Sequence, residues 1–146
     1  MKTVVIDASV AIKWVVEEPG TAEALALRRF RLSAPDLLVA ECANILWKKV
    51  RRGELGRAEA LLAARLLERA DVDLVPMRRM LESAAELATA LDHPAYDCMY
   101  LSLAQSTGRS FVTADERLRA KVRSQGLPAQ VLGLSNALEQ LSAGEG

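Results

Sequence analysis

Short apolar runs alternate with longer segments in which apolar and polar residues mix. Four runs have the length and residue types of strands: 4–6, 72–75, 110–113 and 130–132. In the other segments apolar residues recur every three or four positions, which predicts helices over 11–16, 22–31, 37–52, 57–70, 78–91, 95–106, 115–124 and 135–141. Strands that alternate with helices indicate an α/β fold, with a parallel sheet covered by helices on both faces.

Residues with strong local preferences mark where some of these helices begin and end. Ser9 is the predicted N-cap of the first helix, and Asp36 and Asp115 are the predicted N-caps of two later ones. His93 precedes Pro94 and is interpreted as a turn residue between the fifth and sixth helices.

Length and composition bound the class of protein. The chain has 146 residues, of which 51% are hydrophobic, enough for one domain with a buried core. Without repeats or linkers, residues 1–141 are predicted to form a single domain and 142–146 a flexible C-terminal tail. The longest apolar run, 60–64, is far shorter than the roughly 20 residues of a membrane span, and no signal peptide is recognisable. We therefore expect a cytoplasmic protein without membrane association, with Cys42 and Cys98 as reduced core thiols.

Four acidic residues stand at positions that the sequence pattern does not mark as solvent-exposed surface. Asp7 and Asp115 follow predicted strands, and ligands of parallel sheets bind beyond the carboxyl ends of the strands. Glu41 stands among apolar residues of the third helix, and Asp97 lies in the first turn of the sixth. Each aspartate alone is also explained as a helix cap or as a favourable charge at a helix N-terminus. Glu41 is the hardest to explain in that way.

These acids suggest a metal site if they share one cleft. Four carboxylates in a cleft repel one another unless protons are retained or a cation is bound. Oxygen ligands select hard divalent ions such as Mg²⁺ or Mn²⁺, and the single histidine, His93, excludes a site built from several histidines. The tyrosines near Asp97, Tyr96 and Tyr100, are interpreted as packing residues.

Four short motifs, spread over nearly the whole chain, carry a family resemblance. They are DAS at 7–9, the lone Glu41, YDCMYLSLA at 96–104 and TADERL at 113–118. In this order they resemble the PIN-domain family of metal-dependent ribonucleases, in particular the small toxins of VapBC toxin–antitoxin systems. The resemblance implies a three-layer α/β/α sandwich with a central, mainly parallel five-stranded sheet, and an acidic site that binds Mg²⁺ or Mn²⁺.

The resemblance also implies roles for individual residues. Its acidic quartet corresponds to Asp7, Glu41, Asp97 and Asp115. The three aspartates are the expected metal ligands, whereas Glu41 either ligates through water or orients the nucleophile. Ser9 and Thr113 match the supporting hydroxyl residues, and Arg119 stands where many relatives have an acidic or amide residue, which puts a second metal ion in question. The implied protein is an endoribonuclease that forms a homodimer and binds a cognate antitoxin.

The distribution of charge fits an RNA substrate. The chain has 19 basic and 19 acidic residues, which excludes a protein that is basic throughout, but setting the quartet aside leaves an excess of four basic residues. Candidate RNA-binding residues are Lys48, Lys49, Arg51, Arg52, Arg117 and Arg119. Lys48 lies two helical turns after Glu41 and therefore on the same face, although a solvated helix face is the simpler explanation of any one cluster.

Other functions fit the motifs less well. A phosphatase of the haloacid dehalogenase type needs a second aspartate two residues after Asp7, where this chain has Ser9. A phospho-acceptor receiver domain needs an acidic pair near the first strand and a lysine after the last strands, and neither is evident. A catalytically weak domain of the same fold that binds RNA or a protein stays an alternative, which the presence of all four acids disfavours.

Overall fold

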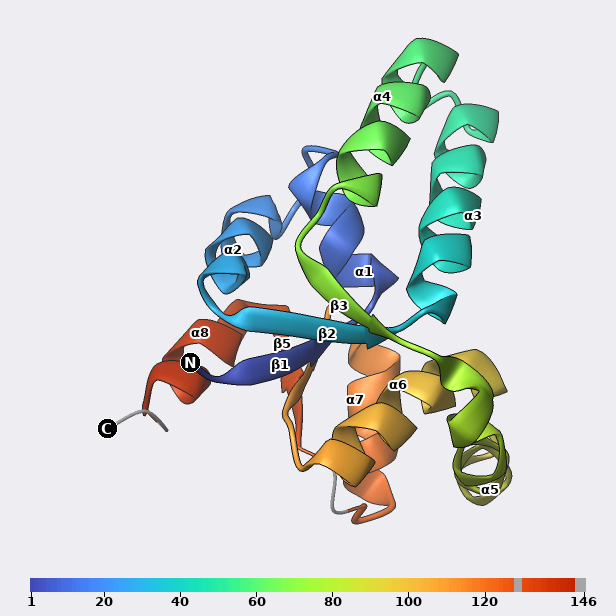
Figure 1. Ribbon diagram of the computed structural model, residues 1–146, viewed down its shortest axis with the longest axis vertical. Coiled ribbons are helices and arrows are strands. Elements are labelled where there is room, and N and C mark those ends of the chain that lie inside the picture. Colours follow the sequence, from blue (N-terminus) through green and yellow to red (C-terminus); the bar gives the residue numbers. More distant parts are fainter. Residues whose placement is uncertain (128–129, 144–146) are drawn as a thin grey trace.

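A five-stranded parallel sheet forms the centre of the protein in a computed structural model, which describes residues 1–127 and 130–143. Its order is β3-β2-β1-β4-β5. The strands are β1 (Thr3–Ile6), β2 (Arg31–Pro35), β3 (Val72–Val75), β4 (Phe111–Thr113) and β5 (Val131–Gly133). Helices cover both faces of the sheet, which confirms the predicted three-layer α/β/α sandwich (Figure 1).

The helices divide between the two faces according to their place in the chain. They are α1 (Ala8–Ala11), α2 (Thr21–Ala26), α3 (Leu37–Arg51), α4 (Arg57–Glu68), α5 (Leu81–Leu91), α6 (Ala95–Thr107), α7 (Glu116–Ser124) and α8 (Leu134–Ala143). Short 3₁₀ turns follow α1, α2 and β3: η1 (Ile12–Trp14), η2 (Leu27–Arg29) and η3 (Met77–Met80). In Figure 1, α1 to α4 lie on one side of the sheet and α5 to α7 on the other, with α3 and α4 projecting as a hairpin.

Strand β2 is absent from the sequence-based prediction, which extends the second helix to residue 31. That prediction is wrong, because α2 ends at Ala26 and Arg31–Pro35 pairs with β1 on one side and β3 on the other. The segment RLSAP lacks the β-branched run of a typical strand. Its conformation is set by pairing on both sides and by burial of residues 32–34, so tertiary context outweighs local propensity.

Two predicted helix caps differ from the structure, one in its residue and one in its hydrogen bond. Asp7, not Ser9, is the N-cap of α1, because its carboxylate accepts a hydrogen bond from the Val10 N–H at 3.3 Å. Asp36 is the N-cap residue of α3, as predicted, but its side chain makes no capping bond; its Oδ1 accepts the N–H of Met77 at 3.3 Å instead. That bond ties the start of α3 to the segment that follows β3.

The sheet and the helices packed on it share a main apolar core, and a second, smaller cluster of Ile12, Leu46, Ala60 and Ala63 lies between η1, α3 and α4. The main core contains both cysteines, which are free thiols, as predicted. Burial raises the pKa of Cys42 to about 12 and that of Cys98 to about 11, so neither thiol forms a thiolate near neutral pH.

The C-terminal elements are slightly displaced from the prediction. Strand β5 is shifted by one residue, to Val131–Gly133, and α8 continues to Ala143. Residues 142 and 143 of the predicted tail are therefore helical, and its remainder, 144–146, lies outside the described residues, as does Pro128 of the predicted turn. Among residues 1–127 and 130–143, no helix is long and apolar enough to cross a membrane.

Candidate active site

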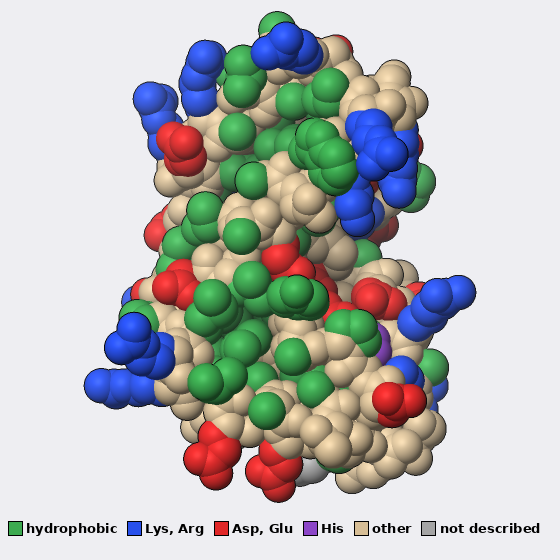
Figure 2. Space-filling model, turned by 90° about the vertical axis from the view of Figure 1, so that its right-hand side faces the viewer, with side chains coloured by type: hydrophobic (Ala, Val, Ile, Leu, Met, Phe, Trp, Pro, Cys, Tyr) green, Lys and Arg blue, Asp and Glu red, His purple; other side chains and the backbone are tan. Residues whose placement is uncertain are grey.

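The carboxyl ends of β1 and β4 form the centre of the candidate site. The chain passes from β1 outward to β2 and β3 and then crosses back to β4, on the other side of β1. The connections after β1 and β4 therefore leave the sheet toward different neighbours, and such a switch point opens a crevice in which ligands bind. Figure 2 views this edge of the sheet, where acidic side chains gather at the middle of the molecule.

Asp7 is the most enclosed member of the quartet, with 6% of its surface exposed. Its Oδ1 accepts the Ser9 hydroxyl at 2.5 Å, and its Oδ2 accepts the Thr113 hydroxyl at 2.5 Å. Burial raises the pKa of Asp7 to about 6; the two hydroxyl bonds oppose this rise, and the charge of Asp97 adds to it. The two hydroxyls thus hold the carboxylate in a defined orientation, whereas burial makes its charged form less stable.

The two hydroxyl residues also join the turns that follow β1 and β4. The Ser9 Oγ accepts the Ala114 N–H at 3.0 Å, and the Thr113 Oγ1 accepts the Asp115 N–H at 3.0 Å. Asp115 is the N-cap of α7, as predicted, because its Oδ1 accepts the Leu118 N–H at 3.2 Å. The hydroxyls therefore connect the first and last aspartates of the quartet through one continuous hydrogen-bonded network.

Glu41 approaches the site from α3 and is held by a tyrosine. The hydroxyl of Tyr100 donates to Glu41 Oε1 at 2.5 Å, and the Tyr100 ring is fully buried and stacked on Phe111. Burial raises the pKa of Glu41, the bond from Tyr100 opposes this rise, and the charge of Asp97 adds to it. Tyr100 is therefore the packing residue that was predicted, and it also orients a candidate catalytic carboxylate.

Asp97, in the first turn of α6, contacts the only histidine of the chain. The His93 Nε2 lies 2.6 Å from Asp97 Oδ2, and the ammonium group of Lys121 lies 3.5 Å from His93 Nδ1. The interpretation of His93 as a turn residue overlooks this contact, for which the spacing of four residues was the available signal. Tyr96, predicted to pack inside, is 65% exposed on the outer side of α6.

The donor set fits a hard divalent cation. Within residues 1–127 and 130–143, no three Asp, Glu, His or Cys side chains are grouped so that they could hold a metal ion. Each acid of the quartet instead contacts a hydrogen-bonding group of the protein. The charge of Asp97 nevertheless raises the pKa of both Asp7 and Glu41, so these carboxylates lie within electrostatic reach of one another. Bound Mg²⁺ or Mn²⁺ relieves such repulsion, and all the donors are oxygen atoms.

The candidate RNA-binding residues on α3 differ in their surroundings. Lys48 and Arg52 are exposed. Lys49 is largely buried and forms ion pairs with Glu18, at 2.8 Å, and with Glu54, at 3.6 Å. Its bond to Glu18 raises the pKa of Lys49. Lys48 on α3 and Arg52 at its C-cap therefore have more accessible charges than Lys49.

The remaining candidates include one arginine that is held against the sheet. Arg51 lies over the exposed ring of Trp47, 5.4 Å from its centroid, and Arg117 is exposed. Arg119 donates to Glu116 at 2.8 Å, and its guanidinium occupies the space where a side chain on Gly133 would lie. Arg119 is therefore packed over β5, beside the strand that carries the network around the first aspartate.

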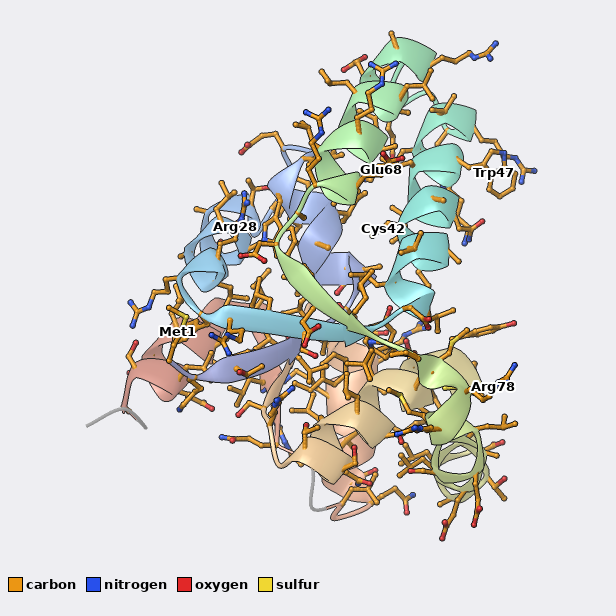
Figure 3. The ribbon with its side chains drawn as sticks, viewed as in Figure 1. Met1, Arg28, Cys42, Trp47, Glu68 and Arg78 are labelled. Carbon is orange, nitrogen blue, oxygen red and sulfur yellow. The ribbon has the colours of Figure 1, made fainter. Side chains whose placement is uncertain are left out.

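An apolar groove of about 340 Å³ lies between α3, α4 and β3. Its lining includes Leu38, Val39, Cys42, Leu46, Leu67 and Leu74. Figure 3 shows Cys42 on the inner side of α3, whereas Trp47 projects outward from that helix. The groove is distinct in character from the acidic crevice, which polar side chains line.

A family model and several curated relatives match most of the chain. The model, described as PIN domain, matches residues 4–123. The chain is 31% identical over 115 residues to the ribonuclease VapC9 of Mycobacterium tuberculosis, an alignment that covers 79% of this chain and 87% of the relative.

Two solved structures share the fold. PAE2754 from Pyrobaculum aerophilum superposes with a TM-score of 0.73 and 23% identity, covering 97% of this chain and 96% of that one. VapBC2 from Rickettsia felis, bound to a DNA fragment from its promoter, superposes with a TM-score of 0.63 and 12% identity, covering 90% of this chain and 98% of that one.

Proposed function

This chain belongs to the PIN-domain family, and on that basis we propose that it is a ribonuclease that hydrolyses RNA phosphodiester bonds as the toxin of a VapBC-type toxin–antitoxin pair. A relative of similar length, 31% identical, is named a ribonuclease. The observation that carries the proposal is the buried Asp7 carboxylate, held between two hydroxyls at the switch point of the sheet and within electrostatic reach of Asp97.

We assign Asp7, Asp97 and Asp115 as ligands of a divalent cation, Mg²⁺ or Mn²⁺. When bound, such an ion offsets the charge that develops on the phosphate oxygens and makes water a stronger nucleophile. The Ser9 and Thr113 hydroxyls each occupy one acceptor site of an Asp7 oxygen, and carboxylate oxygens have further lone pairs. The Val10 N–H takes the second acceptor site of Oδ1, so Oδ2 keeps a free lone pair for the cation while the orientation of the carboxylate is fixed.

Glu41 is suited to accept a proton from the attacking water. Tyr100 fixes Oε1, so we assign Oε2 as the atom that orients the water and receives its proton. The pKa of Glu41 is raised by burial, and a higher pKa makes a carboxylate a better general base near neutral pH.

Measuring whether RNA cleavage depends on a divalent metal ion tests this function. A labelled RNA is expected to be cut in the presence of Mn²⁺ or Mg²⁺, and EDTA is expected to lower the rate by about 100-fold or more, because charge stabilisation by the ion contributes several kcal/mol. Cleavage ends are read on a sequencing gel, and excess Mn²⁺ added after EDTA should restore them. RNA that is bound but stays intact with metal present would favour the alternative, a catalytically weak binding domain.

Exposed basic side chains near the crevice are proposed to hold the RNA backbone. Two neighbouring lysines on α3 allow an effect on RNA binding to be distinguished from an effect on stability. Lys48→Glu is expected to weaken RNA binding and to reduce the slope of log K against log salt by about 1, since one phosphate contact is lost. Lys49→Glu instead places a carboxylate beside Glu18 and Glu54, and should lower the melting temperature. Affinity is measured by fluorescence anisotropy at several salt concentrations.

The control for this comparison is Arg31→Glu. Arg31 is the exposed first residue of β2, so it lies at the amino ends of the strands, whereas the crevice lies at their carboxyl ends. The same change of charge there should leave the RNA affinity and its salt slope close to those of the wild type. Equal losses for Lys48→Glu and Arg31→Glu would mean that only net charge matters, and would remove Lys48 from the RNA path.

We also propose an antitoxin partner and a homodimer. The relative from Rickettsia felis is a VapBC complex, and this chain exposes several large apolar side chains: Val39, Trp47, Leu61, Leu62 and Leu66. All five lie on α3 and α4, the hairpin that projects from the sheet (Figure 1). Several exposed apolar side chains on one projecting hairpin are more than the single scattered ones of an ordinary surface, and they favour a protein interaction site there.

A further inference from the structure

His93 lies in the turn between α5 and α6, and its side chain is not needed to form that turn. The main chain closes the end of α5: Asp92 adopts a left-handed conformation with φ 52°, and the His93 N–H donates to the Ala88 carbonyl at 3.1 Å. The imidazole ring is thus available for contacts outside the turn. Its two nitrogens meet groups on two different helices.

The contacts of the ring define which nitrogen carries the proton in its neutral form. Lys121 Nζ lies 3.5 Å from His93 Nδ1, and an ammonium group can only donate, so Nδ1 acts as the acceptor. The ring proton is then on Nε2, which donates to Asp97 Oδ2 at 2.6 Å. Lys121 is itself held by a bond of 2.9 Å to the Asp92 carbonyl.

This chain of contacts joins two helices that begin at or contain an aspartate of the quartet. Asp97 is in the first turn of α6, and Lys121 is on α7, whose N-cap is Asp115. His93 lies between them and is largely buried, with its side chain 13% exposed. This partly buried bridge between α6 and α7 restricts both the side chain of Asp97 and the distance between the two helices.

We propose that His93 is a positioning residue for the metal site, holding Asp97 by Oδ2 so that Oδ1 is presented to the cation. This inference rests on the proposed function, in which Asp97 is a ligand. Carboxylate ligands in metalloproteins are themselves hydrogen-bonded, and removal of such an outer partner typically weakens metal binding about 10- to 100-fold. Asp97 also acts on Asp7 and Glu41 electrostatically, which agrees with an Asp97 carboxylate that faces the crevice.

Three substitutions at position 93 test the hydrogen bond rather than the bulk of the ring. The amide nitrogen of His93→Gln reaches about as far as Nε2, whereas that of His93→Asn reaches only as far as Nδ1. We expect Mn²⁺ affinity, measured by calorimetry and by the Mn²⁺ EPR signal, to fall about 10- to 100-fold in His93→Ala and His93→Asn. His93→Gln should stay within about threefold of the wild type. Tyr96→Ala, which changes an exposed residue in the first turn of α6, is the control and should bind normally.

The outcomes separate this inference from the proposed function. Equal Mn²⁺ binding by wild type and Asp97→Asn would mean that Asp97 is not a ligand, and the proposed site itself would fail. If Asp97→Asn loses binding but His93→Ala and His93→Asn keep it, the positioning role is overturned. It is equally overturned if His93→Gln binds as weakly as His93→Ala. Should His93→Ala not fold, the Gln and Asn variants, which both keep a polar amide, decide the question.

Discussion

Asp7→Asn is expected to slow RNA cleavage by about a thousandfold, equivalent to roughly 4 kcal/mol, and at the same time to stabilise the metal-free protein. The loss of activity follows because asparagine keeps the size and the capping ability of the side chain but removes the charge that attracts the cation. The gain in stability follows from the burial that raises the pKa of Asp7 from its ordinary value of 3.8 to about 6. The folded protein holds this charge at a cost of about 3 kcal/mol above pH 6.

The direction of the change in stability follows from how the free energy of unfolding depends on pH. Because the pKa of Asp7 is higher in the folded than in the unfolded chain, the folded state binds more protons between pH 3.8 and about 6. The free energy of unfolding contributed by this group therefore falls as pH rises through that window. Asp7→Asn should raise the free energy of unfolding by about 1 to 3 kcal/mol at pH 7.5, and the difference should vanish below pH 4.

Thermal unfolding of the wild type and Asp7→Asn in EDTA, at pH 7.5 and below pH 4, measures this difference in stability. Saturating Mn²⁺ should reverse the order, because it stabilises the folded wild type and not the variant. A variant that cleaves RNA as fast as the wild type and binds Mn²⁺ as tightly would contradict the assignment of Asp7 as a ligand. Asp36→Asn, which changes an exposed carboxylate at the start of α3, is the matched control and should alter neither property in this way.

Thr113→Val is expected to destabilise the protein by about 2 to 4 kcal/mol and to weaken metal binding. The Thr113 hydroxyl is fully buried, donates to Asp7 and accepts the N–H of Asp115. Valine has nearly the same shape but leaves that N–H without its acceptor and Asp7 Oδ2 without its donor. Since the Thr113 bond opposes the rise of the Asp7 pKa, its loss should move that pKa further upward and favour the protonated acid, which binds cations poorly.

Thr113→Ser is the control that keeps the hydroxyl. It removes one buried methyl group and should cost only about 1 kcal/mol, with Mn²⁺ affinity close to that of the wild type. Chemical denaturation and calorimetry of both variants measure the two effects. If serine and valine proved equally harmful to metal binding, the volume of the side chain rather than its hydroxyl would be responsible, and the proposed network around Asp7 would have to be abandoned.

Sequence reasoning succeeded where local pattern and short-range chemistry decide structure. The run before Asp7 forms a buried strand, and Asp115 caps its helix, because apolar content and capping preference act within a few residues. It failed at β2, where RLSAP becomes a strand by pairing with neighbours that are remote in sequence. It also overlooked the contacts of His93 and Tyr100 with the acids, since a histidine beside proline and a tyrosine in an apolar helix each have an ordinary explanation.

The amino-acid sequence by itself determined the class of fold and the order of its elements apart from β2, and it singled out the four acids of the candidate site. Periodicity, caps and motifs are properties of neighbouring residues and are visible without coordinates. Only the tertiary structure decided which groups touch those acids. Ser9 and Thr113, 104 residues apart, meet around one carboxylate, and Tyr100 reaches Glu41 across a separation of 59. Such contacts depend on how the strands pair and how the helices pack over them, and at that junction they hold the buried Asp7 carboxylate in one orientation, which makes it a candidate for metal binding.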